Sequence, residues 1–146
     1  KVIAADMFIP KVDVKVEFFD GQSITTTILS QSLESLFKEA DFISLHVPAQ
    51  DGYIVDEATL SIMKDGVGIV NCARGGVIDE VALIKALDSG KVSFAGLDVF
   101  ESEPKPEMTI LMHPKISLTP HIGAATGEAQ DRIGTELASQ IISILS

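Results

Sequence analysis

Residues 68–80 read Gly-Ile-Val-Asn-Cys-Ala-Arg-Gly-Gly-Val-Ile-Asp-Glu. The apolar run at Gly68–Val70 is too short for a helix, and its branched residues are typical of a buried strand. Arg74 follows the end of that strand, two glycines allow a sharp turn, and Asp79 can cap the helix that comes next. This order predicts a ligand crevice of an α/β protein, because such crevices lie at the carboxyl ends of parallel strands.

Composition limits the classes of fold and partner. The chain has 146 residues, enough for one domain, and 46% of them are hydrophobic. The net charge of −10 repels a phosphate backbone, so we expect no nucleic-acid partner. We also expect no membrane association, because no apolar stretch could span a bilayer and no signal-peptide pattern opens the sequence. Cys72 is the only cysteine, which excludes an intrachain disulfide and favours a cytoplasmic protein.

The rest of the chain alternates between short apolar runs and amphipathic segments. Besides the central strand, the pattern predicts strands at Lys1–Ala5, Phe42–Leu45, Ser93–Leu97 and Ile116–Leu118, and helices at Leu33–Ala40, Asp56–Met63, Asp79–Asp88 and about Gly127 to Leu145. Two further runs, Val14–Phe19 and Ile24–Leu29, are joined through Asp20-Gly21 and predict an inserted hairpin. The alternation predicts a doubly wound α/β fold, with a parallel sheet covered on both faces.

Polar residues follow each predicted strand. They are Asp6, His46 with Val47 and Pro48, Arg74, Asp98 with Glu103, and His121 after Pro120. Parallel strands point the same way, so these residues should gather along one rim of the sheet. There an arginine can bind a carboxylate, a histidine can exchange a proton near neutral pH, and an acid can orient the imidazole. That combination suits hydride chemistry on a 2-hydroxy acid.

Other interpretations exist for each of these residues. His121 could be an ordinary loop histidine, and Glu101 competes with Glu103 as its carboxylate partner. Asp98 could be a turn residue. Asp6 could face water, although an acid at this place in a dinucleotide fold binds the adenosine ribose hydroxyls. Cys72 is better explained as a small buried residue than as a reactive thiol.

Three segments together resemble a known family. They are Asn71-Cys-Ala-Arg-Gly-Gly-Val-Ile-Asp-Glu, Gly96-Leu-Asp-Val-Phe-Glu-Ser-Glu-Pro and Leu118-Thr-Pro-His-Ile-Gly-Ala-Ala-Thr. In order and separation they are similar to the signatures of the NAD-dependent D-2-hydroxyacid dehydrogenases, most of all to the branch that oxidises 3-phosphoglycerate. The resemblance implies an enzyme that transfers a hydride between NAD and a D-2-hydroxy acid. Alternatives on the same fold are glyoxylate, hydroxypyruvate or D-lactate reduction, or a nicotinamide-sensing corepressor.

The resemblance also implies roles for single residues. Arg74 would bind the substrate carboxylate and carbonyl oxygen, His121 would be the general acid and base, and Glu103 would hold His121. We expect no metal site. The residues expected to line the dinucleotide are Asp6, His46, Val47, Pro48, Cys72, Ala73, Arg74, Asp98, His121 and Gly123.

The chain departs from the family pattern in several places. The loop at Ala49–Gly52 is shorter than usual, and neither the glycine-rich phosphate loop nor the substrate domain is present in the sequence. We therefore expect residues 1–125 to form a partial dinucleotide-binding domain, incomplete at its amino-terminal side, and residues 126–146 to form a helix that returns toward the substrate domain. The first strand of the fold would be missing between the strands that end at Asp6 and His46. Homodimerisation through this domain is expected, with Ala82, Ile84 and Leu87 as an aliphatic surface.

Overall fold

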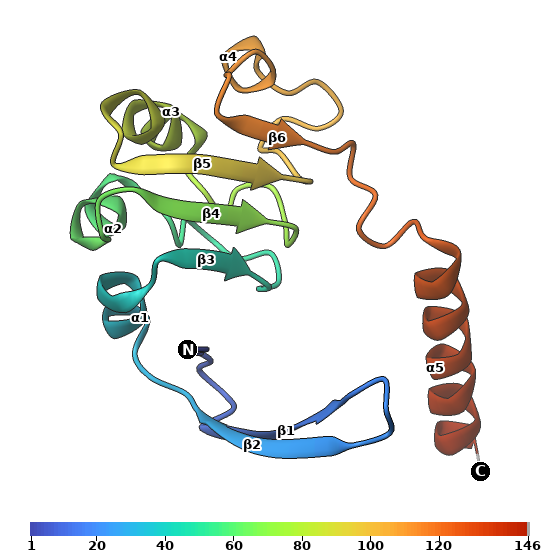
Figure 1. Cartoon of the computed structure of the whole chain (residues 1–146). Coiled ribbons are helices and arrows are strands. Elements are labelled where there is room, and N and C mark those ends of the chain that lie inside the picture. The colour runs from blue at the N-terminus through green and yellow to red at the C-terminus, as the bar shows by residue number, and fades with distance from the viewer. Residues whose placement is uncertain (146) are drawn as a thin grey trace.

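The computed structural model describes residues 1–145, which form a four-stranded parallel sheet, a separate hairpin and five helices (Figure 1). The parallel sheet has the order β3-β4-β5-β6, and β1 pairs with β2 antiparallel. The elements are β1 Lys11–Glu17, β2 Ser23–Leu29, α1 Leu33–Glu39, β3 Phe42–Leu45, α2 Glu57–Ile62, β4 Val67–Asn71, α3 Glu80–Ser89, β5 Val92–Leu97, α4 Met108–Leu111, β6 Ile116–Leu118 and α5 Gly127–Leu145. The predicted α/β fold class is confirmed.

Apolar side chains from alternate positions of the strands build the core. Ile43, Ile69 and Ala95 lie in one row across β3, β4 and β5, and all three are buried. Helix α3 packs against β5, and its Leu83 and Leu87 are fully buried. The sequence signals for α3 are confirmed, because Asp79 caps its first turn and Gly90 ends it at a positive φ of 82°.

The opposite face of the sheet carries exposed aromatic side chains. Phe42 and Phe94 pack together over Gly68, with ring centroids 6.1 Å apart. Phe42 is 72% exposed and Phe94 is 40% exposed. Consecutive parallel strands are joined by right-handed crossovers, which place the connecting helices on the face opposite to these aromatic side chains. We expected both faces of the sheet to be covered, but the described residues leave the face with Phe42 and Phe94 exposed.

The strand predicted at Lys1–Ala5 is not formed. Ala4 makes an isolated parallel bridge to Ser30, and its carbonyl oxygen accepts a hydrogen bond from the N–H of Gln31 at 2.9 Å. A strand requires a continuous partner, and this segment has none within residues 1–145. This segment makes no hydrogen bond to β3, which agrees with the expected gap between the two. A cavity of about 940 Å³ lies between the two, lined mainly by residues 1–6, α1 and β3.

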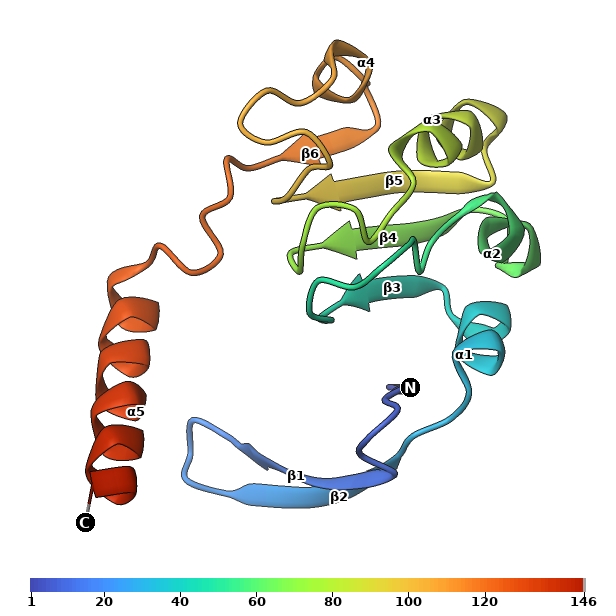
Figure 2. The same ribbon diagram turned by 180° about the vertical axis from the view of Figure 1, so that it is seen from behind.

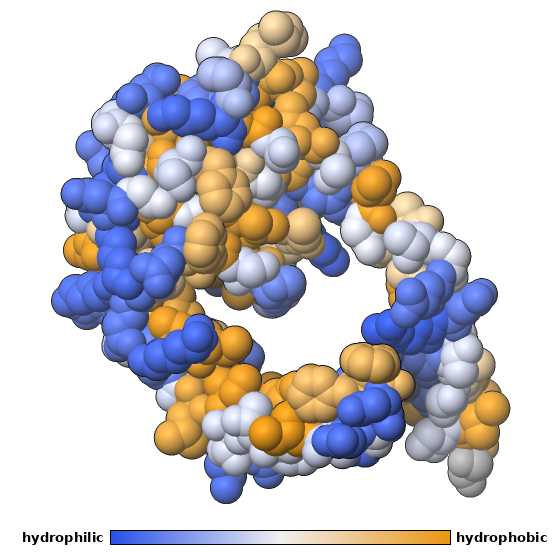
Figure 3. All heavy atoms as spheres, in the orientation of Figure 1, coloured by the Kyte–Doolittle hydropathy of each residue, from blue (hydrophilic) through white to orange (hydrophobic). Residues whose placement is uncertain are grey.

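The hairpin and α5 extend away from the parallel sheet (Figures 1 and 2). The predicted turn is confirmed, with Gly21 at φ 82°. The first strand begins at Lys11, three residues before the predicted start, and Phe18 and Phe19 lie in the turn. None of the described residues of α5 is buried, and nearly all of them are exposed. Apolar surface is visible on the hairpin in the space-filling view (Figure 3).

Two other expectations need correction. The proposed dimer surface on α3 is wrong in part, because Ala82 and Leu87 are buried in the core and Ile84 packs against it. Helix α4, at Met108–Leu111, lies between the strands predicted at Ser93–Leu97 and Ile116–Leu118, where the sequence pattern predicted no helix. Within residues 1–145, no helix has the length and apolar character needed to cross a membrane.

Candidate active site

The carboxyl ends of the four parallel strands form one aligned row. Leu45, Asn71, Leu97 and Leu118 are register partners across β3, β4, β5 and β6. The residue after each of them therefore leaves the sheet at the same end, where the arrowheads lie one above another in Figure 1. The predicted rim is confirmed for the segments after these strands. Asp6, which follows no strand, is the exception.

Asn71 shapes the turn that presents Arg74. Its side chain is buried, its Oδ1 accepts a hydrogen bond from the N–H of Ala73 at 3.0 Å, and its Nδ2 donates to the carbonyl oxygen of Arg74 at 3.1 Å. Arg74 is exposed and donates one guanidinium N–H to the carbonyl oxygen of Ala73 at 2.6 Å. Other donors of the guanidinium remain for a ligand. Asn71 was missed as a functional residue, although a polar residue ending a buried strand is a signal that could have found it.

The loop after Arg74 packs directly on the loop after β5. A Cβ built on Gly75 would lie 1.9 Å from the carbonyl oxygen of Phe100, so no other residue fits without moving the backbone. Gly76 has a φ of 77°, a conformation that side chains rarely adopt. Both glycines are therefore required by the turn, as the sequence predicted.

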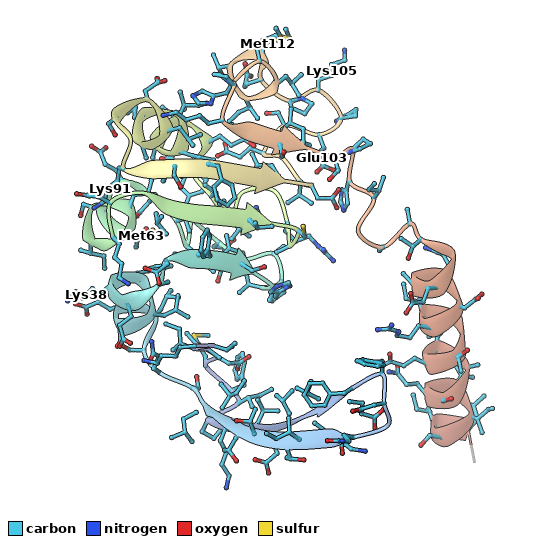
Figure 4. The ribbon with its side chains drawn as sticks, viewed as in Figure 1. Lys38, Met63, Lys91, Glu103, Lys105 and Met112 are labelled. Carbon is cyan, nitrogen blue, oxygen red and sulfur yellow. The ribbon has the colours of Figure 1, made fainter. Side chains whose placement is uncertain are left out.

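His121 and Glu103 form a hydrogen-bonded pair. The Nδ1 atom of His121 lies 2.8 Å from Oε2 of Glu103, and Oε1 of Glu103 accepts a hydrogen bond from the N–H of Phe100 at 3.0 Å. These bonds, first that with His121 and then that with Phe100, lower the pKa of Glu103. Figure 4 shows Glu103 at the ends of β5 and β6. Glu101 instead accepts from the N–H of Glu80, so the geometry favours Glu103 as the partner of His121.

Asp98 anchors the loop that carries His121. It is 3% exposed, and its Oδ1 accepts hydrogen bonds from the hydroxyl of Thr119 at 2.5 Å and the N–H of Ile122 at 2.9 Å. Its Oδ2 accepts from the N–H of Gly123 at 2.8 Å. Burial alone would raise the pKa of Asp98, but these three bonds and the charge of His121 lower it. Asp98 is thus more than a turn residue.

Comparison with known proteins identifies the family. Residues 4–123 match the model of the D-isomer specific 2-hydroxyacid dehydrogenase NAD-binding domain. The chain belongs to this family.

Relatives of several activities share this likeness. A hydroxypyruvate reductase of Thermotoga maritima is 47% identical over 99% of the chain, and a D-3-phosphoglycerate dehydrogenase of Methanocaldococcus jannaschii is 42% identical over 99%. The chain covers 45% and 26% of these two relatives, so it spans less than half of their length. A D-lactate dehydrogenase structure from Aquifex aeolicus, complexed with NAD and lactic acid, aligns with 81% of the chain at a TM-score of 0.66 and 35% identity, and the chain covers 41% of it.

NAD is the cofactor of this dehydrogenase domain. Asp6, His46 and Val47, which we expect to line the dinucleotide, all border the cavity of about 940 Å³ between residues 1–6 and β3. Asp6 has its Oδ1 occupied by the N–H groups of Phe8 and Ile9, at 2.7 and 2.9 Å, which leaves Oδ2 for a ligand. His46 contacts the Ser44 hydroxyl through Nε2 at 2.7 Å.

The remaining residues expected at the cofactor lie along the rim. Pro48 is exposed beyond β3, Ala73 is buried beneath the Arg74 turn, and Gly123 contacts Asp98. Cys72 is exposed, so its interpretation as a buried residue is wrong. Among residues 1–145, no three His, Cys, Asp or Glu side chains are grouped as metal ligands would be.

A second, apolar cavity of about 400 Å³ lies beside the His121–Glu103 pair. Besides these two residues it is lined by Phe100, Pro104, Pro106, Leu111, Leu118, Thr119 and Pro120. The His121–Glu103 pair therefore borders an apolar wall on the side of α4.

Proposed function

We propose that the complete enzyme, this chain together with the substrate domain, transfers a hydride between NAD and a D-2-hydroxy acid. The observation that carries the proposal is the His121–Glu103 hydrogen bond at the rim where the Arg74 turn also emerges. An acid–base pair and a carboxylate-binding arginine are the groups that oxidation of a 2-hydroxy acid requires. Bound at this rim, NAD would supply the acceptor for the hydride from C2 of the substrate.

The two side chains divide the work on the substrate. Because Glu103 contacts Nδ1 of His121, Nε2 is the ring nitrogen that can accept the substrate's hydroxyl proton. The carboxylate stabilises the imidazolium that this proton transfer creates. Arg74 offers parallel N–H groups to the substrate carboxylate and fixes C2 next to His121. In the reverse direction His121 returns the proton to the carbonyl oxygen.

We propose 3-phosphoglycerate as the substrate, which would make this the first enzyme of serine biosynthesis, a cytoplasmic homodimer. The likeness to D-3-phosphoglycerate dehydrogenases supports this. Hydroxypyruvate is the second candidate, because the hydroxypyruvate reductase is 47% identical over nearly the whole chain. Arg74 and His121 recognise only what all 2-hydroxy acids share, so other parts of the complete enzyme select among them.

A panel of D-2-hydroxy and 2-oxo acids, followed by NADH absorbance with the complete enzyme, tests the proposal. We expect turnover of 3-phosphoglycerate, with Glu103→Gln mainly moving the pH profile and Glu101→Gln leaving it in place. If the enzyme turns over hydroxypyruvate but not 3-phosphoglycerate, hydroxypyruvate takes the place of the substrate that we propose. A protein that binds NADH but turns over no acid in the panel would refute the enzymatic function and favour a nicotinamide-sensing module.

A further inference from the structure

Two glutamates connect the loop of Arg74 to the loop of Glu103. The N–H of Glu80 donates to Oε1 of Glu101 at 2.9 Å, and the N–H of Glu101 donates to Oε1 of Glu80 at 2.8 Å. Glu80 begins α3, six residues after Arg74, and Glu101 lies two residues before Glu103. Each carboxylate thus binds the backbone of the other residue, although side chains of like charge repel when they are held close together.

The same two loops also meet at Gly75 and Phe100. Gly75 lies against the carbonyl of Phe100, while the N–H of Phe100 donates to Glu103. The contacts therefore run without a break from the Arg74 turn through Phe100 and Glu103 to His121. A shift of the Phe100–Glu103 loop would move Glu103, the partner of His121, and change the distance between this pair and Arg74.

We propose that Glu80 and Glu101 are positioning residues, whose reciprocal hydrogen bonds hold the Glu103 loop against the Arg74 loop. They keep the acid–base pair and the carboxylate-binding arginine in one relative geometry. The inference rests on the proposed dehydrogenase function and adds to it two residues that touch neither substrate nor cofactor.

The charges around the pair determine what pH measurements should show. Burial is the main cause that raises the pKa of Glu80, the N–H of Glu101 opposes it, and the carboxylates of Glu101 and Glu107 add to it. Glu101 in turn faces Tyr53, whose pKa it raises, with Asp79 contributing less. Both glutamates are therefore held in a strongly acidic surrounding.

Glu103 faces His121 and Asp98, and part of the lowering of its pKa comes from the N–H of Phe100. If the loop loosens, that hydrogen bond weakens and the pKa of Glu103 rises toward its ordinary value. Glu103 must be ionised to hold His121. The pH–rate profile, which depends on the Glu103–His121 pair, should then shift.

The test compares Glu101→Ala and Glu80→Ala with the corresponding glutamine variants in the complete enzyme. Glutamine keeps a carbonyl oxygen that can accept the backbone N–H, whereas alanine removes the acceptor. We expect each alanine variant to lower kcat about tenfold, to shift the pH–rate profile and to change KM less. The glutamine variants should recover most of the activity, and the double alanine variant should be little worse than either single variant.

Asp79→Ala is the matched control. It removes a hydrogen bond to the N–H of Ala82 in the same first turn of α3 without touching the Glu103 loop. It should lower thermal stability and leave kcat and the pH profile unchanged. Equal losses of kcat in Asp79→Ala and Glu80→Ala, or alanine variants that lose stability alone, would overturn the inference.

A second measurement separates this inference from the proposed function. The Nδ1 proton resonance of His121 reports its bond to Glu103 whether or not the protein turns over a substrate. It should weaken in Glu101→Ala and persist in Asp79→Ala. An unchanged resonance in both variants refutes the positioning role, and an inactive wild-type enzyme refutes the dehydrogenase function alone.

Discussion

Asp98 offers the sharpest test of how the His121 loop is held. Its carboxylate accepts bonds from the backbone of Ile122 and Gly123 and from the Thr119 hydroxyl. Asp98→Ala leaves the two N–H groups without that acceptor, while the hydroxyl can turn to water. Hydrogen bonds to a charged group contribute about 1.5–3 kcal/mol each, but Ile122 and Gly123 are exposed and water replaces part of this. We expect the free energy of unfolding to fall by about 2–4 kcal/mol.

Asp98→Asn should cost less, about 1–2 kcal/mol, because its Oδ1 can keep the Thr119 and Ile122 bonds while its amide faces the N–H of Gly123. The loop places His121 at a φ of 54°, so we also expect kcat to fall about tenfold in both variants. Urea unfolding and steady-state kinetics of the complete enzyme measure these effects. Asp65→Asn is the control, since Asp65 makes only an exposed ion pair with Lys91 and should change stability by less than about 1 kcal/mol.

The pH dependence follows from the lowered pKa of Asp98. A carboxyl group whose pKa is lower in the folded state stabilises the fold above its unfolded pKa, about 3.9, and loses this contribution as the pH falls through the folded value. The stability difference between wild type and Asp98→Asn should stay constant from pH 8 to about pH 5 and narrow below about pH 4. If Asp98→Ala has the same kcat and the same free energy of unfolding as the wild type, the anchoring role is refuted.

Three further predictions concern the complete enzyme. His121→Ala should lower kcat at least about a hundredfold, whereas Arg74→Ala should also raise KM; unchanged KM in the latter would contradict carboxylate binding. Asp6 should select NAD, because its carboxylate repels a 2′-phosphate, so equal turnover of NAD and NADP by the wild type would contradict that role. Gly75→Ala should lower the free energy of unfolding by about 1–3 kcal/mol or more, because its Cβ meets the Phe100 carbonyl. The same change at Gly134, which lies in open space on α5, should raise the free energy of unfolding by about 0.5–1 kcal/mol. The unfolding midpoints of the two variants measure this difference.

The parts of the fold with local signals could be predicted from the sequence. The branched run of β4, the glycines of the turn and the Asp79 cap each act within a few residues, so their prediction needed no knowledge of distant contacts. The rim followed from the shared direction of the strands. The segment at Lys1–Ala5 has an equally apolar sequence. A strand, however, depends on a neighbour from any part of the chain, and this segment makes only an isolated bridge, from Ala4 to Ser30.

The site was predictable in its residue types and less so in its connections. Choosing Glu103 over Glu101 depends on which carboxylate reaches His121, and the two are only two residues apart. The buried bonds of Asn71 and Asp98 and the exchange between Glu80 and Glu101 join separate loops. Such contacts depend on tertiary distances that residue spacing does not contain.

The free edge of β3 leads to the last prediction. Among the described residues β3 pairs with β4 alone, and the cavity of about 940 Å³ separates it from residues 1–6. An unpaired edge and exposed apolar surface such as Phe42, 72% exposed, are costly to leave in water. We predict that in the complete enzyme a further parallel strand, with a glycine-rich turn after it, fills this space.

Comparing residues 1–146 alone with the complete enzyme tests this. Backbone amides of β3 that do not bond to β4 should exchange at least about tenfold more slowly in the complete enzyme, because the added strand accepts their hydrogen bonds. Calorimetry should find weak NAD binding by residues 1–146, since the amino end of a helix behind a glycine-rich turn is what binds the pyrophosphate. Equal exchange rates would refute the added strand. Equal NAD affinities would show instead that the cavity beside Asp6 and His46 holds the dinucleotide without such a turn.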